Sequence, residues 1–148
     1  MAELNVSRKN IQGLLSLNDP TTKGKIFVIP EYQRPYRWEV DTCDVLWNDL
    51  KNFFEEHKDD DREYFLGSIV TCDDTDEQNR INIIDGQQRI TSFLLLLRAF
   101  YYKLEDQLVD NPSDEEVEGL MKSIEPCIWK INPMTKKVSN KKETHIKT

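Results

Sequence analysis

A carboxylate, a glycine, two amides and a guanidinium follow one another in the segment DGQQR, residues 85–89. A short apolar run precedes this segment and a long pattern of apolar residues at helical spacing follows it, so it lies where a strand passes into a helix. The first N–H groups of a helix have no partners within the helix, and the helix dipole favours negative charge there. The segment therefore predicts an anion site, and its glycine and arginine suit a phosphate.

Each residue of the segment can take a role at such a site. Gly86 lets a phosphate approach the backbone, and Arg89 offers a two-pronged fork to phosphate oxygens. Asp85 can cap the helix or ligate a magnesium ion carried by a nucleotide. Gln87 and Gln88 do not titrate at neutral pH, but they can orient a water molecule or read a base edge.

A plainer interpretation of the same residues stays open. Asp85 is then an N-cap, Gly86 a turn residue, the two glutamines exposed helix formers, and Arg89 the partner of an acid. A cation in the first turn is unfavourable for the helix, so something negative is expected beside Arg89. The segment is not a Walker loop, because GxxxxGK[ST] is absent.

A second candidate site is the loop IPEYQRPYRW, residues 29–38. Its aromatic and arginine side chains can stack a base and hold phosphates. The alternative is a loop whose aromatic side chains pack onto the core and whose arginines pair with acids. The side chains in question are Tyr32, Gln33, Arg34, Tyr36, Arg37 and Trp38.

The segments IPEYQRPYRW, YFLGSIV and IIDGQQRITSFLLLL, taken in series, resemble the N-terminal domain of GmrSD-type modification-dependent restriction enzymes. The resemblance covers about residues 8–105, and its one visible departure is Ser92-Phe93 after Thr91, where Thr-Leu is commoner. It implies a ParB/sulfiredoxin-like α/β (α+β) fold, in which a small mixed sheet is packed by helices. The DGQQR motif is then expected at a strand-to-helix junction.

The resemblance also implies a function. It implies an NTP-binding, NTP-hydrolysing regulatory domain, with magnesium, in a protein that restricts modified phage DNA. Asp85 would hold magnesium, Gln88 would orient the attacking water, and Arg89 would stabilise developing charge, so these three are the expected catalytic residues. The residues expected to bind nucleotide or phosphate are Tyr32, Gln33, Arg34, Tyr36, Gly86, Gln87, Arg89 and Thr91.

Two other functions stay open. One is a non-enzymatic DNA-binding module that uses Arg34, Arg37, the aromatic loop and a basic tail. The other is a ParB-like nuclease, which the lack of a metal-ligand cluster beyond Asp85 disfavours. DNA cleavage in the family commonly belongs to a C-terminal HNH-type domain. His57 and His145 lie in unrelated contexts, so that partner domain is expected outside this chain, which then contacts modified DNA through the full-length protein.

Charge divides the chain of 148 residues into two parts. Residues 128–148 carry six lysines and one glutamate, which is +5, so the net charge of −7 leaves −12 for residues 1–127. The prediction is one domain over residues 1–127, followed by a basic tail or linker that is truncated from a longer protein. The acidic body argues against gripping DNA through the overall field of the domain.

No apolar run long enough for a membrane span or a signal peptide occurs, so a cytoplasmic protein without a membrane partner is expected. Three widely spaced cysteines predict buried free thiols. The first expected elements are a helix over 7–17 capped by Ser7, a strand ending at Pro30 and a helix capped by Asp41. A hairpin of strands 64–72 and 81–85 should follow, and then a central helix after the motif. The last expected elements are a helix with a capping box from Ser113 to Glu116, which Pro126 ends or kinks, and a strand near 144–148.

Overall fold

The computed structural model describes residues 4–17, 22–132, 134–141, 144 and 146–147. It confirms the expected mixed α/β class, while the finer ParB/sulfiredoxin-like arrangement stays a prediction. In chain order the elements are α1 Ile11–Leu15, β1 Ile26–Val28, α2 Val40–His57, β2 Val70–Asp73, β3 Arg80–Asp85, α3 Gln87–Asp110, α4 Glu115–Ile128 and β4 Ile146–Lys147.

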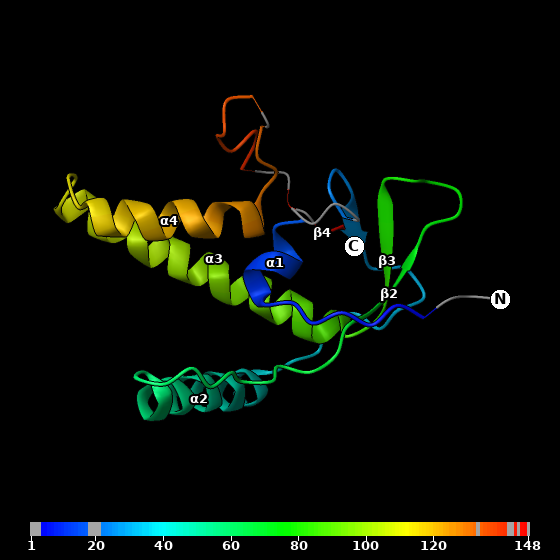
Figure 1. The fold of residues 1–148 in the computed structure, drawn as a ribbon, viewed down its shortest axis with the longest axis horizontal. Coiled ribbons are helices and arrows are strands. Elements are labelled where there is room, and N and C mark those ends of the chain that lie inside the picture. The colour runs from blue at the N-terminus through cyan, green and yellow to red at the C-terminus, as the bar shows by residue number, and fades with distance from the viewer. Residues whose placement is uncertain (1–3, 18–21, 133, 142–143, 145, 148) are drawn as a thin grey trace.

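The four strands form one sheet in the order β2-β3-β1-β4. β1 lies parallel to both β3 and β4, with Phe27 opposite Ile81 on one side and Ile146 on the other. β2 and β3 pair antiparallel, which confirms the predicted hairpin. α3 leaves the end of β3 directly and runs away from the sheet beneath α4, while α2 lies apart below it (Figure 1). The sheet thus fixes where the long helix starts.

Two hydrophobic clusters share α3. The first joins the sheet to the start of α3, where Phe27 of β1 and the alternating Ile81 and Ile83 of β3 meet one face of the helix. Its buried members are Leu15, Leu17, Phe27, Ile81, Ile83, Ile90, Phe93 and Cys127. Because Ile90 is fully buried one residue after the DGQQR segment, the core holds that segment in place.

The second cluster joins the far half of α3 to α4. Its buried members are Tyr101, Val117, Met121, Ile128 and Trp129. The rings of Tyr101 and Trp129 meet edge to face with centroids 4.8 Å apart. The predicted boundary after residue 127 falls inside α4, and described residues beyond it reach the core at Trp129 and the sheet at β4.

Two helix starts differ from the sequence prediction by a few residues. α1 begins at Ile11, because Asn10 rather than Ser7 is its N-cap and accepts a hydrogen bond from the Gly13 N–H at 2.7 Å. α4 is capped by Asp114, which accepts from the N–H of Val117, so Ser113 is not the cap. In both cases the cap is a residue type that ranks equal to Ser as an N-cap, so sequence alone could not choose between the positions.

α2 and the end of α4 also correct the sequence prediction. Glu39 stands at the N-cap of α2 without a side-chain bond, and Asp41 lies inside the first turn, where its charge favours the helix dipole. Pro126 does not end α4 before Ile128, although it removes one backbone donor.

The predicted strand over residues 64–72 is wrong in its first half. Only Val70–Asp73 forms β2, and every residue of that strand is exposed. Gly67 adopts φ +105°, a left-handed conformation that interrupts an extended chain, and the Phe65 side chain is 83% exposed. Residues 64–69 therefore form an ordered connection instead of a buried strand.

The sequence predicted buried free thiols and no membrane-spanning segment. All three cysteines are free, but only Cys127 is buried, while Cys43 is half-buried and Cys72 exposed. Within the described residues, none of the helices has the length and apolar character that a bilayer span requires.

The buried Tyr101 hydroxyl gives the first testable prediction. Burial and its hydrogen bond to Glu125 at 2.9 Å raise the pKa of Tyr101 above the ordinary value of 10.0. The unfolded chain therefore loses this proton first, so the contribution to stability is complete below pH 10 and is lost as the pH rises through the folded-state pKa. We expect Tyr101→Phe to flatten the fall in unfolding free energy from about pH 10 upward, measured by urea titration.

The matched control for that experiment is Tyr32→Phe, at an exposed tyrosine. Its unfolding free energy should follow that of the unaltered chain over the same range. Equal slopes for both variants would contradict a buried, proton-retaining Tyr101.

Candidate functional site

A single cleft brings the two sequence motifs together. It has a volume of about 520 Å³ and lies between the loop of residues 29–38 and the N-terminus of α3. Although the motifs are some fifty residues apart in sequence, both contribute to its walls. The lining residues are Gln33, Arg34, Arg37, Trp38, Asp85, Gly86, Gln87, Gln88 and Arg89.

The first turn of α3 carries no side-chain cap. Gly86 is the N-cap, with φ 92° and ψ 9°, and no side chain bonds to the first turn. The prediction that Asp85 caps the helix is therefore wrong. The Asp85 carboxylate is exposed at the cleft, and it has no hydrogen bond or ion pair to any residue that the structure describes. The first-turn N–H groups and the helix dipole are left for a ligand.

Gly86 is required by packing as well as by its backbone conformation. A Cβ built there would lie 2.4 Å from the Cδ1 of Ile69 and 3.1 Å from the carbonyl oxygen of Ser68. The residue before α3 thus touches the connection that leads into β2. The sequence suggested only that a glycine lets phosphate approach, and the close approach of residues 68–69 adds a second reason.

Arg89 lies against the same connection. Its Nη1 donates a hydrogen bond of 2.6 Å to the Ser68 carbonyl, and a Cβ at Gly67 would come within 2.7 Å of the Arg89 Cζ. No carboxylate pairs with Arg89 in the described part of the chain, so the ion-pair interpretation is wrong. The guanidinium is oriented by a neutral acceptor, so its positive charge is not paired with an acid and remains available to a ligand in the cleft.

Three glutamines attach the loop to the motif. Gln33 donates to the carbonyl of Ile84 at 2.9 Å and accepts from Gln87 at 3.1 Å. Gln88 donates to the carbonyl of Pro35 at 2.9 Å and accepts from the backbone N–H of Arg37 at 2.7 Å. Gln87 and Gln88 are half-buried, so the interpretation as exposed helix formers is wrong. Their first role in the structure is to hold the loop beside the helix.

Tyr36 anchors the loop on its other side. Its hydroxyl lies 2.9 Å from the Ser92 Oγ in α3 and 3.7 Å from the Cys43 Sγ in α2. Burial is the largest cause of the raised pKa of Tyr36. Tyr32, Tyr36 and Thr91, which were predicted to bind nucleotide, do not line the cleft, and for Tyr36 the hydroxyl contacts support a structural role.

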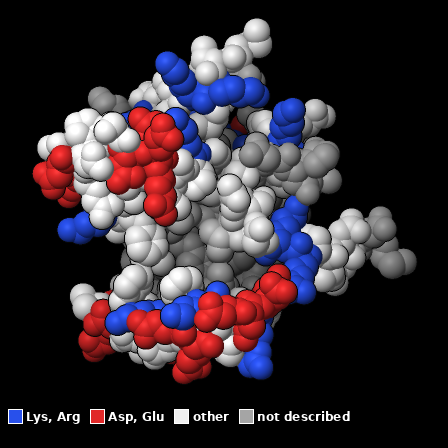
Figure 2. Space-filling view, turned by 60° about the vertical axis from the view of Figure 1, so that its left-hand side comes forward, with Lys and Arg blue, Asp and Glu red and all other residues white. Residues whose placement is uncertain are grey.

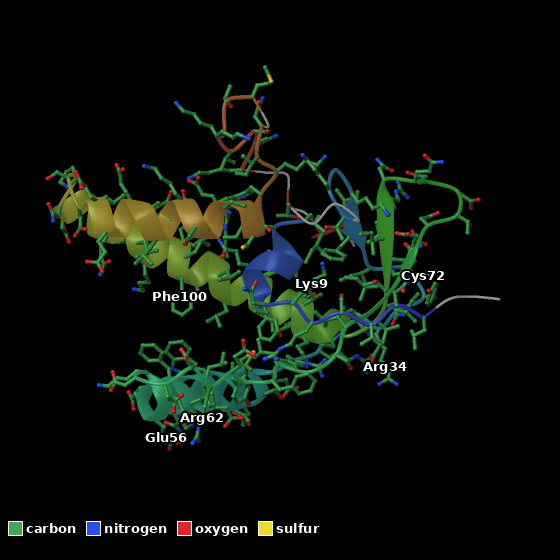
Figure 3. The ribbon with its side chains drawn as sticks, viewed as in Figure 1. Lys9, Arg34, Glu56, Arg62, Cys72 and Phe100 are labelled. Carbon is green, nitrogen blue, oxygen red and sulfur yellow. The ribbon has the colours of Figure 1, made fainter. Side chains whose placement is uncertain are left out.

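The cleft is positive on an acidic protein. Arg34, Arg37 and Arg89 line it against the single carboxylate of Asp85, while the whole chain has a net charge of −7. Arg34 and Arg37 form no ion pair with any described acid. Figure 3 shows the Arg34 side chain extending away from the ribbon beside the start of α3. Unpaired guanidinium groups grouped in one cleft suit a polyanion.

Sequence reasoning placed most of the lining, but it left out two lining residues and misassigned two residues that contact Arg89. Arg37 and Trp38 were left out of the expected nucleotide-binding set, although they lie in the same loop. Gly67 and Ser68 were interpreted as strand, and the glycine within that apolar run was the available signal for a close backbone approach.

The site fits a magnesium ion only if phosphates supply most of its ligands. Within the described residues, no group of three or more His, Cys, Asp or Glu side chains is arranged to hold a metal. Asp85 is the one carboxylate in the cleft. A magnesium ion bound through one carboxylate, water and substrate phosphates is compatible with this donor set, whereas an all-protein metal cage is not.

The fold and the cleft define an α/β domain with an arginine-lined cleft at a strand-to-helix junction. The family model described as the N-terminal domain of the GmrSD restriction endonuclease matches residues 12–147. The chain belongs to this family, which confirms the resemblance seen in the sequence. The match includes most of the segment after residue 127. A comparison with curated proteins gives no match.

The glycines give the second testable prediction. Gly86→Ala meets both a left-handed backbone and a clash with residues 68–69, whereas Gly24→Ala meets only the backbone cost at φ +80°. We expect a loss in unfolding free energy of about 1–2 kcal/mol for Gly24→Ala and at least about 1 kcal/mol more for Gly86→Ala. Urea unfolding of both variants measures the difference.

Gly119→Ala is the control for the glycines, because Gly119 lies within α4 and an added Cβ meets open space. It should stabilise the chain by about 0.5–1 kcal/mol. Equal losses for Gly86→Ala and Gly24→Ala would mean that residues 68–69 do not pack against the helix start.

Proposed function

We propose that this domain binds a nucleoside triphosphate in the cleft and hydrolyses it, as the regulatory part of a modification-dependent restriction protein in phage defence. The observation that carries the proposal is the convergence of Arg34, Arg37 and Arg89 on an uncapped helix N-terminus in one cleft. Triphosphates carry several negative charges close together, and this arrangement supplies cations and backbone N–H groups at the same place.

The size and lining of the cleft support a nucleotide. Its volume of about 520 Å³ lies within the range of small-molecule sites. Trp38 is the aromatic residue of the lining and offers a face on which a base can stack. The hydrogen bonds of Gln33, Gln87 and Gln88 hold both walls before a ligand arrives, so little ordering remains to oppose binding.

Hydrolysis is proposed as attack of a water molecule on the terminal phosphorus. A bond forms between phosphorus and the water oxygen while the bond to the bridging oxygen breaks, and that oxygen leaves with the electron pair on the nucleoside diphosphate. The water proton passes to solvent, since neither glutamine accepts a proton. Arg89 and the first N–H groups of α3 stabilise the charge that develops.

The role proposed for each polar residue follows from whether its polar atoms already take part in hydrogen bonds with other described residues. Asp85 would hold magnesium, which when bound neutralises phosphate charge. Gln88 already uses its amide nitrogen and oxygen on the loop, so the structure supports a positioning role for it. Gln87 donates to Gln33, and its oxygen has no hydrogen bond within the described residues, so Gln87 is the better candidate to orient water.

The contact with modified DNA and with a C-terminal nuclease domain is proposed for the full-length protein. A direct grip on DNA by this domain is less well supported, because residues 40–63, which include α2, carry nine Asp and Glu against three Lys and Arg. A segment with this excess of acids repels a long phosphate backbone more than a single nucleotide.

The third prediction tests nucleotide binding. Arg89→Ala should weaken the binding of radiolabelled GTP, CTP, UTP or ATP at least about tenfold, because a charge-assisted hydrogen bond contributes about 1.5–3 kcal/mol. Gly67→Ala should weaken it as well, since the new Cβ displaces the Arg89 guanidinium. Equilibrium dialysis measures the affinity, and thin-layer chromatography of the same samples measures hydrolysis.

Arg62→Ala, at an exposed arginine outside the cleft, is the matched control and should bind like the unaltered chain. The proposal fails if none of the four nucleotides binds, or if Arg89→Ala and Arg62→Ala bind equally. Binding without hydrolysis would retain the site and remove the enzymatic step. Nucleotide-independent binding of DNA in a salt series would favour the DNA-binding alternative.

A further inference from the structure

A second surface of the domain, separate from the nucleotide cleft, lies along α2. None of the 18 residues of α2 is buried, although the helix carries an apolar stripe. Leu46 contacts the edge of the first core cluster, and the ring of Phe53 packs 5.3 Å from that of Tyr64. An amphipathic helix of this length gains most of its stability by burying its apolar stripe, and here the stripe is at most half-buried, with Trp47 and Phe54 exposed.

Trp47 and Phe100 mark the place where α2 and α3 meet. Their ring centroids are 5.9 Å apart, and Phe100 points from α3 toward α2 (Figure 3). Trp47 is nevertheless 42% exposed and Phe100 39% exposed. Phe54 lies two turns after Trp47 on the same face of α2, yet it is 68% exposed. The two helices diverge beyond the Trp47–Phe100 contact (Figure 1), and the space-filling view shows the surface hollowed between two acidic clusters (Figure 2). We call this hollow, with Trp47, Phe54 and Phe100, the groove.

The groove has an acidic border. Figure 2 shows Asp and Glu side chains along the lower body of the molecule and again at the upper left, on either side of a hollow. The lower body corresponds to α2 and the segment after it, residues 40–63, where nine acidic residues outnumber three basic ones. An apolar floor bordered by acids is complementary to an apolar stripe bordered by bases.

We propose that this groove binds an amphipathic helix of a partner protein that carries Lys and Arg on both sides of its apolar stripe. Trp47, Phe54 and Phe100 would contact the stripe, and the acids of residues 40–63 would pair with the bases. A second copy of this chain fits poorly, because a symmetric contact would bring two acidic α2 surfaces together. The inference is independent of the nucleotide site, since these three residues are outside the cleft lining.

The fourth prediction uses a defined probe. A fluorescent, helical peptide of about 18 residues, with leucines at helical spacing and lysines flanking them, should bind the chain in an anisotropy titration. Phe54→Gln should weaken this binding at least about fivefold, as expected for an aromatic contact residue. Because Phe54 is exposed, this substitution should leave the fold intact, which the unfolding curve of the variant verifies.

Two controls distinguish binding in the groove from non-specific hydrophobic or electrostatic binding of the peptide. Val109→Gln removes an exposed apolar side chain of α3 on the side opposite to Phe100, and it should leave binding unchanged. A peptide with the same leucines flanked by glutamates should bind at least about tenfold more weakly, because the acidic border repels it.

Several outcomes would overturn the inference. They are no binding of the lysine peptide, equal loss for Phe54→Gln and Val109→Gln, or equal affinity for the glutamate peptide. Sedimentation that shows a dimer of the unaltered chain and a monomer of Phe54→Gln would assign the groove to self-association and would also overturn it.

Discussion

The contact of the connection Gly67–Ser68–Ile69 with the start of α3 is the constraint on which the site depends. An arginine in the first turn of a helix opposes the helix dipole, and no described acid compensates Arg89. The Ser68 carbonyl orients its guanidinium, and the absence of side chains at Gly67 and Gly86 lets the two backbones approach. The unfavourable charge is thereby fixed at a helix N-terminus that already attracts anions. Both features favour the same ligand.

The second wall of the cleft is attached to this corner by amide groups. Gln33, Gln87 and Gln88 form hydrogen bonds between the loop and the β3–α3 junction, while Tyr36 reaches Ser92. Amides and hydroxyls position the loop without neutralising its arginines, which ion pairs with acids would do. The loop is therefore held in place while Arg34 and Arg37 keep their charge.

Much of the site could be predicted because its signals are local. The DGQQR segment combines residue types that are unusual at a helix start, and the apolar spacing after it identified α3. What sequence could not provide was the partner of each side chain. The bonds from Gln88 to Pro35 and from Arg89 to Ser68 cross 53 and 21 positions of the chain, and no periodicity reports contacts of that kind.

The fold shows the same limit. The hairpin of β2 and β3 followed from two apolar runs and a short link, yet residues 64–69 were interpreted as strand from their apolar composition. Tertiary contact overrides that preference, because the segment must turn at Gly67 to meet Arg89. The amphipathic character of α2 is likewise a property of its sequence, but apolar spacing does not show whether a stripe is covered.

A crystal structure of the chain with magnesium and a non-hydrolysable nucleoside triphosphate tests the central claim most directly. The account predicts phosphate oxygens within about 3 Å of the Arg89 guanidinium and of the first N–H groups of α3, with Arg34 or Arg37 closing on the same phosphates. Phosphates bound elsewhere, or a cleft that stays empty at saturating nucleotide, would contradict it.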